Sequence, residues 1–458
     1  MQDAEGQGAE SATNAMGQPL SLSLLPSLSK SSPFYGSSSA LSFAKVIIAA
    51  ALPNFSLASP EIPENSADGS RTTVYASSVE DATDLPMRSV ADGMIENFFR
   101  RSHDIFRVLH RPTFMAEYDR VWLPGYEAST TFLALLNILF GLSCIFNKGV
   151  CTKESEKYYR RSVQLRRITS DAESVTLMEV QTLLLQCHYL QSTSSATRCW
   201  QTLSQAISAA YTLGLNCASS HITNPILRES HLRAWLACRN LDSVSASTFG
   251  RVPQISLSTA SLVPMPAEVA DDECITPTGI EDTPHTTTGP SRMSAFVWSG
   301  KIYAVMSHIL QRLYVPMDIR GHQDTETVEN EIMLSIESDL QELRQGLPSH
   351  LSIDKPVDLA EYADPSDWRL RQRVIIQNRP SLLRALKAKA TPASGTSTAG
   401  ATLASGTSAS ARQLCFECAC EQIDLCYATT ATQLDAPWFR RFCEENAGCS
   451  PVQAGVVR

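Results

Sequence analysis

Residues 127–146 read EASTTFLALLNILFGLSCIF, and this stretch decides the fold class. Phe132, Leu136 and Leu139 belong to an apolar set so dense that it would cover nearly the whole circumference of a helix. A helix of that kind is stable only where other helices enclose it. The stretch therefore predicts a buried helix at the centre of a helical core.

Amphipathic stripes with helical spacing follow this stretch along the chain. Apolar residues recur every three or four positions, and so share one face of a helix, within residues 177–187, 200–213, 232–239, 293–314 and 326–345. No run of alternating apolar and polar residues is bounded by the Asn-Gly or Asp-Gly pairs typical of hairpins. The sequence predicts an all-α protein, a large multi-helix domain with a disordered N-terminal leader and flexible loops.

Composition and charge indicate a folded protein with no general affinity for nucleic acid. Of 458 residues, 43% are apolar and 19% are charged, whereas globular proteins average about 25% charged residues. The net charge of −9 repels phosphate unless basic residues gather locally. The longest apolar run, residues 46–52, is too short for a membrane span and starts too late for a signal peptide. Thirteen irregularly spaced cysteines predict reduced thiols rather than a disulfide framework.

Changes in composition divide the chain into expected segments. Prolines with acidic residues fill 256–290, and Gly, Ser, Thr and Ala fill 391–410. The segments are a disordered leader (1–33), a partly ordered lead-in and polar linker (34–84), a helical part (85–255), a Pro-rich linker (256–290), a continuing helical part (291–390), a low-complexity loop (391–410) and C-terminal helices (411–458). The last segment lacks an obvious helix stop, which leaves open a truncated C-terminus.

The most informative motif is FFRRSHDIFRVLHRPTF at residues 98–114. Its pattern predicts the end of one helix, an extended stretch, and a new helix begun at Pro112, where the missing N–H of proline is tolerated. A residue before proline is restricted to extended backbone, so His110 and Arg111 are expected to hold the join between the two elements rather than to serve catalysis.

This motif resembles the start of the fungal-specific transcription factor domain, the middle homology region of fungal zinc-cluster regulators. The match is close over Leu109–Phe114, and two further family blocks follow in the same order within residues 200–216 and 233–251. The resemblance covers about residues 34–445. The residues that match family motifs are expected to have structural roles: Phe99, His103, Phe106, His110, Arg111, Pro112, Phe114, Trp200, Gly214, Trp235, Asp242, Gly250 and Arg251.

The sequence also departs from the family pattern. Asp104 and Arg107 stand where the family usually has prolines, Leu236 replaces a tryptophan, Ser243 replaces an arginine, and Val252 replaces a proline. These departures bear on local geometry and leave the order of the family blocks intact.

The resemblance implies a regulatory domain that controls DNA-templated transcription in the nucleus, without catalytic activity. Family members usually contact DNA through six cysteines that hold two zinc ions N-terminal to this domain. Here the first cysteine is Cys144 and residues 1–143 lack a run of Lys and Arg, so the zinc-cluster module is missing from this chain. No cofactor is expected in the chain, and DNA would be bound only through a missing or partner-supplied module.

A second hypothesis stays open beside this one. The chain could be an interaction protein without DNA binding that dimerises with a full-length zinc-cluster regulator and restrains it. Either hypothesis admits a homo- or heterodimer and a small-molecule effector, and no membrane partner is expected. In both, we expect a mostly apolar cavity between helices.

Six cysteines lie close together near the C-terminus: Cys415, Cys418, Cys420, Cys426, Cys443 and Cys449. Cys415 and Cys418 have the spacing of a zinc knuckle, but the other gaps do not form two Cys-x-x-Cys pairs and no DNA-reading basic residues accompany them. We therefore expect a helix over about residues 411–429 with inward-facing thiols rather than a metal site.

Catalytic and basic patterns are weak. Gly36–Ala40 lacks the final glycine and the strand-turn-helix setting of a nucleophile elbow. The acidic cluster 271–273 lies in the Pro-rich linker, whereas a magnesium-dependent helical cyclase would carry it on a helix. The basic stretch 157–167 contains two Arg-Arg pairs, but Glu154 and Glu156 precede it, which favours a solvated helix face over an import signal or a phosphate-binding patch.

Overall fold

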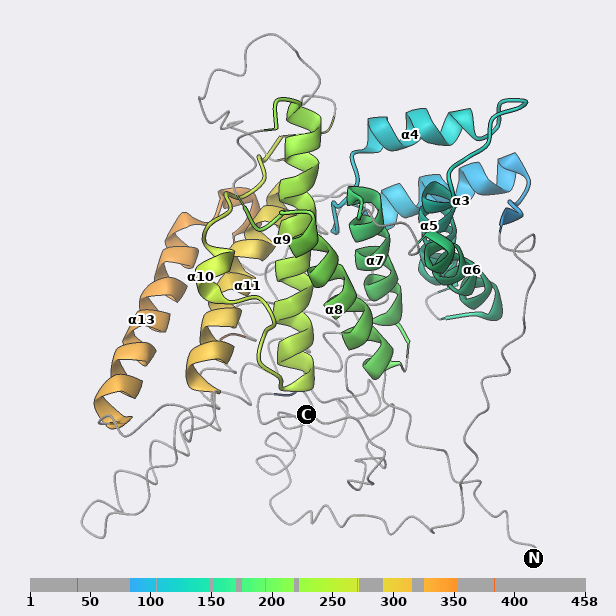
Figure 1. The fold of residues 1–458 in the computed structure, drawn as a ribbon. Coiled ribbons are helices and arrows are strands. Elements are labelled where there is room, and N and C mark those ends of the chain that lie inside the picture. Colours follow the sequence, from blue (N-terminus) through green and yellow to red (C-terminus); the bar gives the residue numbers. More distant parts are fainter. Residues whose placement is uncertain are drawn as a thin grey trace, which may run out of the picture.

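The computed structural model describes residues 39, 83–103, 105–148, 151–169, 175–193, 195–217, 222–269, 271, 291–314, 325–352 and 383. Within these residues every regular element is a helix and none is a strand (Figure 1), so the all-α prediction is confirmed for this part of the chain. The predicted leader, the low-complexity loop and the C-terminal cysteine helix lie outside the described residues, and the segment boundaries stay predictions.

The described helices, in chain order, are α3 (Arg88–Arg101), α4 (Arg111–Arg120), α5 (Thr130–Lys148), α6 (Lys153–Thr169), α7 (Leu177–Leu190), α8 (Ala196–Thr212), α9 (Pro225–Phe249), α10 (Leu257–Ala260), α11 (Ser294–Leu313) and α13 (Thr325–Gly346), followed by a 3₁₀ turn at Ser349–Leu351. Neighbours in space follow the order α13, α11, α9, α8, α7, α5, and α5 also contacts α3 and α6. Figure 1 shows this succession running across the molecule from α13 to α6.

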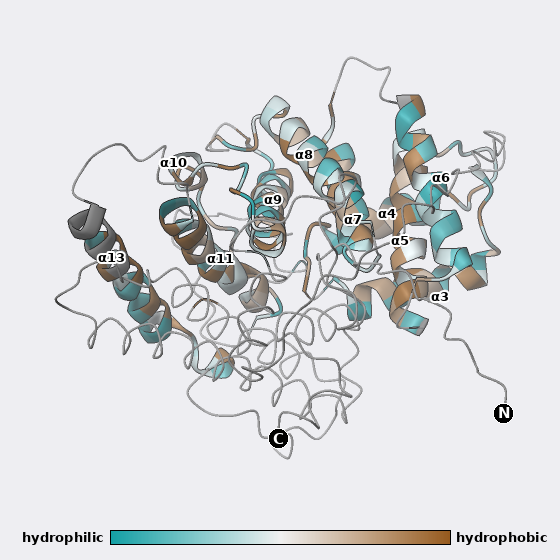
Figure 2. Cartoon of the chain, turned by 90° about the horizontal axis from the view of Figure 1, so that it is seen from below, coloured by the Kyte–Doolittle hydropathy of each residue, from teal (hydrophilic) through white to brown (hydrophobic). Residues whose placement is uncertain are grey.

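Helix α5 lies at the centre of the larger core, as its all-round apolar sequence predicts. Leu136, Ile138, Leu139 and Phe140 have no exposed surface, because α3, α6 and α7 pack around the helix. The segment Thr130–Asn147 is long and apolar enough to span a membrane, yet 83% of it is buried inside the protein. It is therefore accounted for as the core helix of the bundle. By contrast, α6 and α13 show the mixed hydrophilic and hydrophobic surface of amphipathic helices (Figure 2).

Helix α9 joins two hydrophobic cores. Its middle packs into the core built around α5, whereas Val244 and Ala246 near its end pack with Trp298 and Ile302 of α11 in a second core. Gly300 permits this crossing, because a Cβ at that position would overlap the Cδ1 of Leu236. A residue with a Cβ at this position would force Leu236 or the helices to shift, so glycine favours the close approach of α9 and α11.

The ends of α9 follow the chemistry of helix caps. The side chain of Asn224 accepts a hydrogen bond from the N–H of Leu227 at 3.1 Å, and Pro225 takes the first helical position, where no N–H is needed. At the other end Gly250 adopts a left-handed conformation with φ of 66°. A residue with a Cβ is strained there, which explains why glycine ends the helix.

Two regions differ from the sequence expectation. Within the predicted Pro-rich linker, residues 257–260 form α10, so this part is folded onto the protein rather than a plain loop. The charge pattern predicts a solvated helix face for the basic stretch on α6. This is confirmed for Arg160, which is exposed and paired with Glu156, but it is wrong for Arg161. The side chain of Arg161 is 7% exposed and donates to the carbonyl oxygen of Asp84 at 2.9 Å. It anchors the chain that precedes α3, and a charge pattern alone does not reveal such a contact.

Candidate functional site

The motif between α3 and α4 is buried, and its first histidine is neutral. His103 is 3% exposed, and its Nε2–H donates to the carbonyl oxygen of Leu109 at 2.9 Å. Burial, reinforced by the positive charge of Arg107, lowers the pKa of His103 to about 3. His103 therefore closes the bend after α3 by a hydrogen bond and carries no charge at neutral pH.

Aromatic contacts fix the same motif to the core. The ring of Phe99 lies 4.9 Å from that of His103 and 5.5 Å from that of Phe114, measured between centroids. Phe106 stacks on His188 of α7 with centroids 5.1 Å apart. Such pairs add to the hydrophobic burial of each ring, so these motif residues act through packing.

His110 and Arg111 form the start of α4. The Nδ1 of His110 accepts from the backbone N–H of Thr113 at 3.4 Å, which makes His110 the N-cap. Its Nε2–H donates to the carbonyl oxygen of Asp271 at 3.2 Å. Pro112 lies in the first turn of the helix, as its sequence position predicts, and Arg111 pairs on the surface with Glu96 at 2.7 Å. The motif is thus a helix cap that also holds a distant segment.

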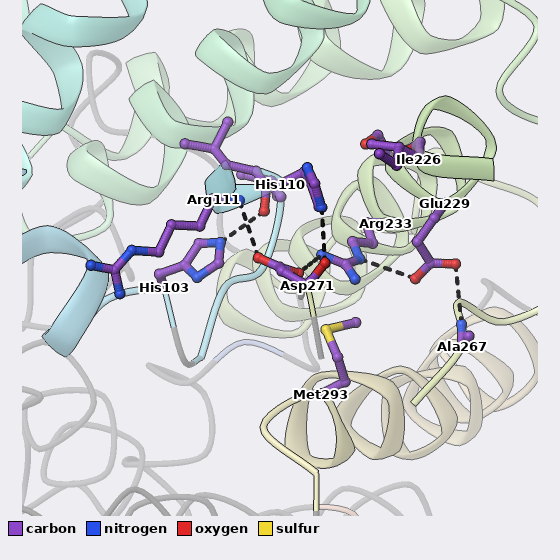
Figure 3. A network of polar contacts seen from close by, with 12 residues as sticks. His103, His110, Arg111, Ile226, Glu229, Arg233, Ala267, Asp271 and Met293 are labelled. Atoms are coloured by element: carbon purple, nitrogen blue, oxygen red, sulfur yellow. Dashed lines mark hydrogen bonds and ion pairs between the residues drawn. The ribbon is translucent and has the colours of Figure 1, made fainter. Parts of the chain in front are cut away.

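Asp271 is the centre of a buried ion network (Figure 3). Its Oδ1 accepts from Nη1 of Arg233 at 2.5 Å, and its Oδ2 accepts from the backbone N–H of Arg111 at 3.1 Å. Arg233 is 1% exposed and also donates from Nε to Glu229 at 3.0 Å. Burial opposes ionisation of Asp271, but the charge of Arg233 and these hydrogen bonds outweigh it and lower its pKa to about 2. Asp271 thereby ties α4 to α9 as a carboxylate.

The second and third family blocks meet at the ends of α8 and α9. The ring of Trp200 lies 5.9 Å from that of Phe249, and the guanidinium of Arg251 lies 4.8 Å above the Trp200 ring. Gly250 supplies the turn that brings Arg251 back over this ring. Gly214 supplies a second left-handed turn after α8, with φ of 72°.

Trp235 and Asp242 act from the interior of α9. Trp235 is 1% exposed and packs edge-on against Tyr211 with centroids 5.5 Å apart. Asp242 accepts the backbone N–H groups of Gln254 and Ile255 at 3.0 and 2.8 Å. Burial raises the pKa of Asp242 to about 6 even though these two bonds favour its charged form. Asp242 holds the segment after α9 against the helix.

A cavity of about 730 Å³ opens beside Asp242, between α9, α10, α11 and α13. Apolar walls such as Leu257 and Trp298 match the expectation of an apolar cavity between helices. Charged side chains also line it, including Arg239 and Lys301, which no sequence pattern placed there. The volume is typical of small-molecule sites.

Sequence reasoning selected the motif residues but not the groups that join them. His103, His110 and Arg111 come together around Asp271, whereas Asp242 lies at the cavity, further along α9. In the sequence, Asp271 stands out only as part of an acidic cluster. Nothing in the sequence shows that it pairs with Arg233, which lies 38 positions earlier. In the sequence, Arg233 stands between Leu232 and Ala234, and a charged residue within such an apolar stretch is the signal that could have indicated a carboxylate partner.

The zinc implied by the family resemblance finds no ligand set in the described part of the chain. There, no group of three or more His, Cys, Asp or Glu side chains could hold a metal ion. The described cysteines are free thiols, among them the buried Cys144, Cys187, Cys199 and Cys238. The C-terminal cysteines lie outside the described residues.

The motif residues pack, cap helices and pair charges, and they define a helical domain with a cavity between its helices. The chain belongs to the family of the fungal specific transcription factor domain, whose family model matches residues 95–345. That range begins within α3 and ends one residue before the end of α13, so it contains all of α4 to α11.

Relatives of this chain are named as transcription factors. The transcription factor FBD3 of Fusarium pseudograminearum is 26% identical over 383 residues, which are 76% of this chain and 48% of that protein. The protein of the same name from Gibberella moniliformis is 26% identical over 180 residues, 38% of this chain and 24% of that protein. The transcriptional activator protein acu-15 of Neurospora crassa is 22% identical over 321 residues, 68% of this chain and 33% of that protein. No solved structure matches.

The chain spans about a quarter to a half of the length of these relatives. Activities that belong to the whole length of the relatives are therefore a matter of proposal for this chain.

Proposed function

We propose that this chain is the regulatory part of a fungal transcription factor that acts in the nucleus, with DNA contacted by a module outside the helical body. The observation that carries the proposal is the family match over residues 95–345, which coincides with one packed succession of helices. Relatives that match 76% and 68% of this chain are named a transcription factor and a transcriptional activator.

The charge distribution supports indirect contact with DNA. The chain has a net charge of −9, and two of its arginines, Arg161 and Arg233, are buried in ion pairs rather than available to phosphate. A domain of this kind acts through contacts with proteins or small molecules. The hypothesis of a partner that only restrains another regulator is not favoured, because the relatives are themselves named as transcription factors.

The test is a reporter assay in a fungal cell. The full chain is fused to a heterologous DNA-binding protein whose operator lies upstream of a reporter gene. We expect a several-fold change in reporter transcription relative to the DNA-binding protein alone, and nuclear fluorescence of the chain fused to a fluorescent protein. A destabilised variant, Arg233→Met, is expected to lose the effect, and the surface variant Glu96→Gln is expected to keep it. A fusion that leaves transcription unchanged would refute the proposal.

A further inference from the structure

The cavity beside α9 has the size and walls of a small-molecule site. Its volume of about 730 Å³ lies within the range of about 300–1,000 Å³ typical of ligand pockets. Trp298 and Val305 of α11 form one apolar wall, and Leu257 and Met265 form the other. An apolar molecular body of moderate size can be enclosed between them.

Arg239 lines this cavity as a cation to which no described residue supplies a counter-ion. Its side chain has no hydrogen bond or ion pair with any residue of the chain that the structure describes. It is partly buried on α9, and burial lowers the pKa of its guanidinium. Desolvating a charge without a partner is unfavourable, so this position calls for an anion from outside the described helices.

The next residue, Asn240, adds a polar side chain to the same cavity. Asn240 is 6% exposed, and its Oδ1 has no exposed surface and no hydrogen-bond partner among the described residues. This oxygen is an acceptor, so an anion cannot satisfy it. Only the Nδ2–H group of the amide can donate a hydrogen bond to an anion.

The charged groups that line the cavity balance in number but differ in whether they are paired. Three cations and three carboxylates line it: Arg239, Lys301, Arg312, Asp242, Asp339 and Glu342. The Nζ of Lys301 lies 3.7 Å from the centre of the Trp298 ring. Asp242 accepts two backbone N–H groups, and Asp339 pairs with His308 at 2.7 Å. Glu342 is exposed. Arg239 is thus a lining cation to which the described residues supply neither an ion pair nor a ring contact.

We propose that the cavity binds a small amphipathic carboxylate. The guanidinium of Arg239 holds the carboxylate, the Nδ2–H group of Asn240 is the neighbouring donor, and the apolar body lies between Trp298 and Leu257. Arginine suits this role because its planar donors match both oxygens of a carboxylate. Only the consequence of binding, a change in transcription, rests on the proposed regulatory function. Binding itself is measured on the purified chain, so failure of the reporter assay and failure of binding are separate outcomes.

The test compares two probes with the same apolar body, 1-pyrenebutyrate and 1-pyrenebutanol, on the purified full-length chain. Binding is followed by energy transfer from tryptophan, because Trp298 lines the cavity. We expect the carboxylate to bind about ten- to hundredfold more tightly than the alcohol, the range for a charge-assisted hydrogen-bonded pair. Arg239→Gln is expected to abolish that preference and to leave binding of the alcohol unchanged.

Two further variants locate the site. Arg228→Gln removes a similar charge from α9 at a position that does not line the cavity, and it is expected to keep the preference. Ala304→Phe fills the cavity from α11 and is expected to weaken both probes. Far-ultraviolet circular dichroism confirms that each variant is folded. Equal affinity for the two probes, or a preference that survives Arg239→Gln in a folded protein, would overturn the proposal.

Discussion

Replacing Asp271 with asparagine is expected to destabilise the protein strongly, although it changes a single atom of the side chain. The carboxylate of Asp271 is 8% exposed and lies 2.5 Å from the guanidinium of Arg233, which is 1% exposed. Removing one partner of a buried ion pair costs about 3–5 kcal/mol, because the other charge stays buried. Arg233 keeps Glu229 at 3.0 Å, and asparagine can still accept a hydrogen bond, so we expect about 2–3 kcal/mol.

The lowered pKa of Asp271 leads to a stabilisation of similar size. A pKa lowered from 3.8 to about 2 corresponds to about 2–3 kcal/mol of stabilisation at neutral pH. Because the folded protein holds this carboxylate ionised, the contribution is fully present above the unfolded pKa and is lost as the pH falls through about 2. The difference in stability between the wild type and Asp271→Asn is therefore expected to shrink as the pH falls below about 4.

The assay is urea denaturation followed by circular dichroism, with Glu96→Gln as the matched control. Glu96 forms an ion pair with Arg111 at 2.7 Å, but the two side chains are 64% and 46% exposed. An exposed pair of this kind contributes at most about 1 kcal/mol. If Asp271→Asn costs no more than the control, the buried network does not stabilise the join between α4 and α9, and the reasoning is wrong.

Three further predictions concern other parts of the fold. Gly300→Ala is expected to destabilise the protein by about 1–3 kcal/mol, because the new Cβ would overlap Leu236. The destabilisation should be smaller when Leu236→Ala is also present. Chemical denaturation of the single and double variants measures both effects. The thiols of Cys187 and Cys199 are fully buried, with their sulfurs 3.6 Å apart. They are expected to resist alkylation in the folded protein and to react after unfolding, which mass spectrometry would show. Fast labelling of these two cysteines in native buffer would contradict the prediction. Burial lowers the pKa of His188 to about 4, so as the pH drops from about 6.5 the unfolded chain takes up a proton first and the folded state loses stability. His188→Gln should reduce the slope of the unfolding free energy against pH by about 1.4 kcal/mol per pH unit in this range. Equal slopes for the wild type and the variant would contradict the assignment.

Much of the fold follows from local pattern. The density of apolar residues in 127–146 suffices to predict a buried helix, because only enclosure by other helices satisfies such a surface. Asn224, Pro225 and Gly250 mark the two ends of α9 through requirements of individual backbone groups. These signals lie within a few residues of the structure that they determine, so the sequence displays them directly.

The network and the cavity depend on contacts that local pattern does not encode. Asp271 meets Arg233 only because the chain returns along α9 after α10. Arg239 has the spacing of an ordinary helix residue, and only the packing of α11 and α13 around it shows that no described residue pairs with it. Even Asp242, which the family motif singles out, shows its role only through the two N–H groups that lie 12 and 13 residues further along.

The segment that follows α9 explains why the cavity has a stable outer wall. It is held at its start by Asp242, which accepts the N–H groups of residues 254 and 255, and near its end by Glu229, which accepts the N–H of Ala267 at 3.3 Å. Between these two points lie Leu257 and Met265, which line the cavity. Carboxylate bonds to backbone N–H groups are stronger than neutral hydrogen bonds, so the wall is fixed to α9 at both ends. Because Glu229 also pairs with Arg233, the ion network at the family motif and the wall of the cavity are held by one helix, and a molecule bound in the cavity would lie against a segment that the motif helps to anchor.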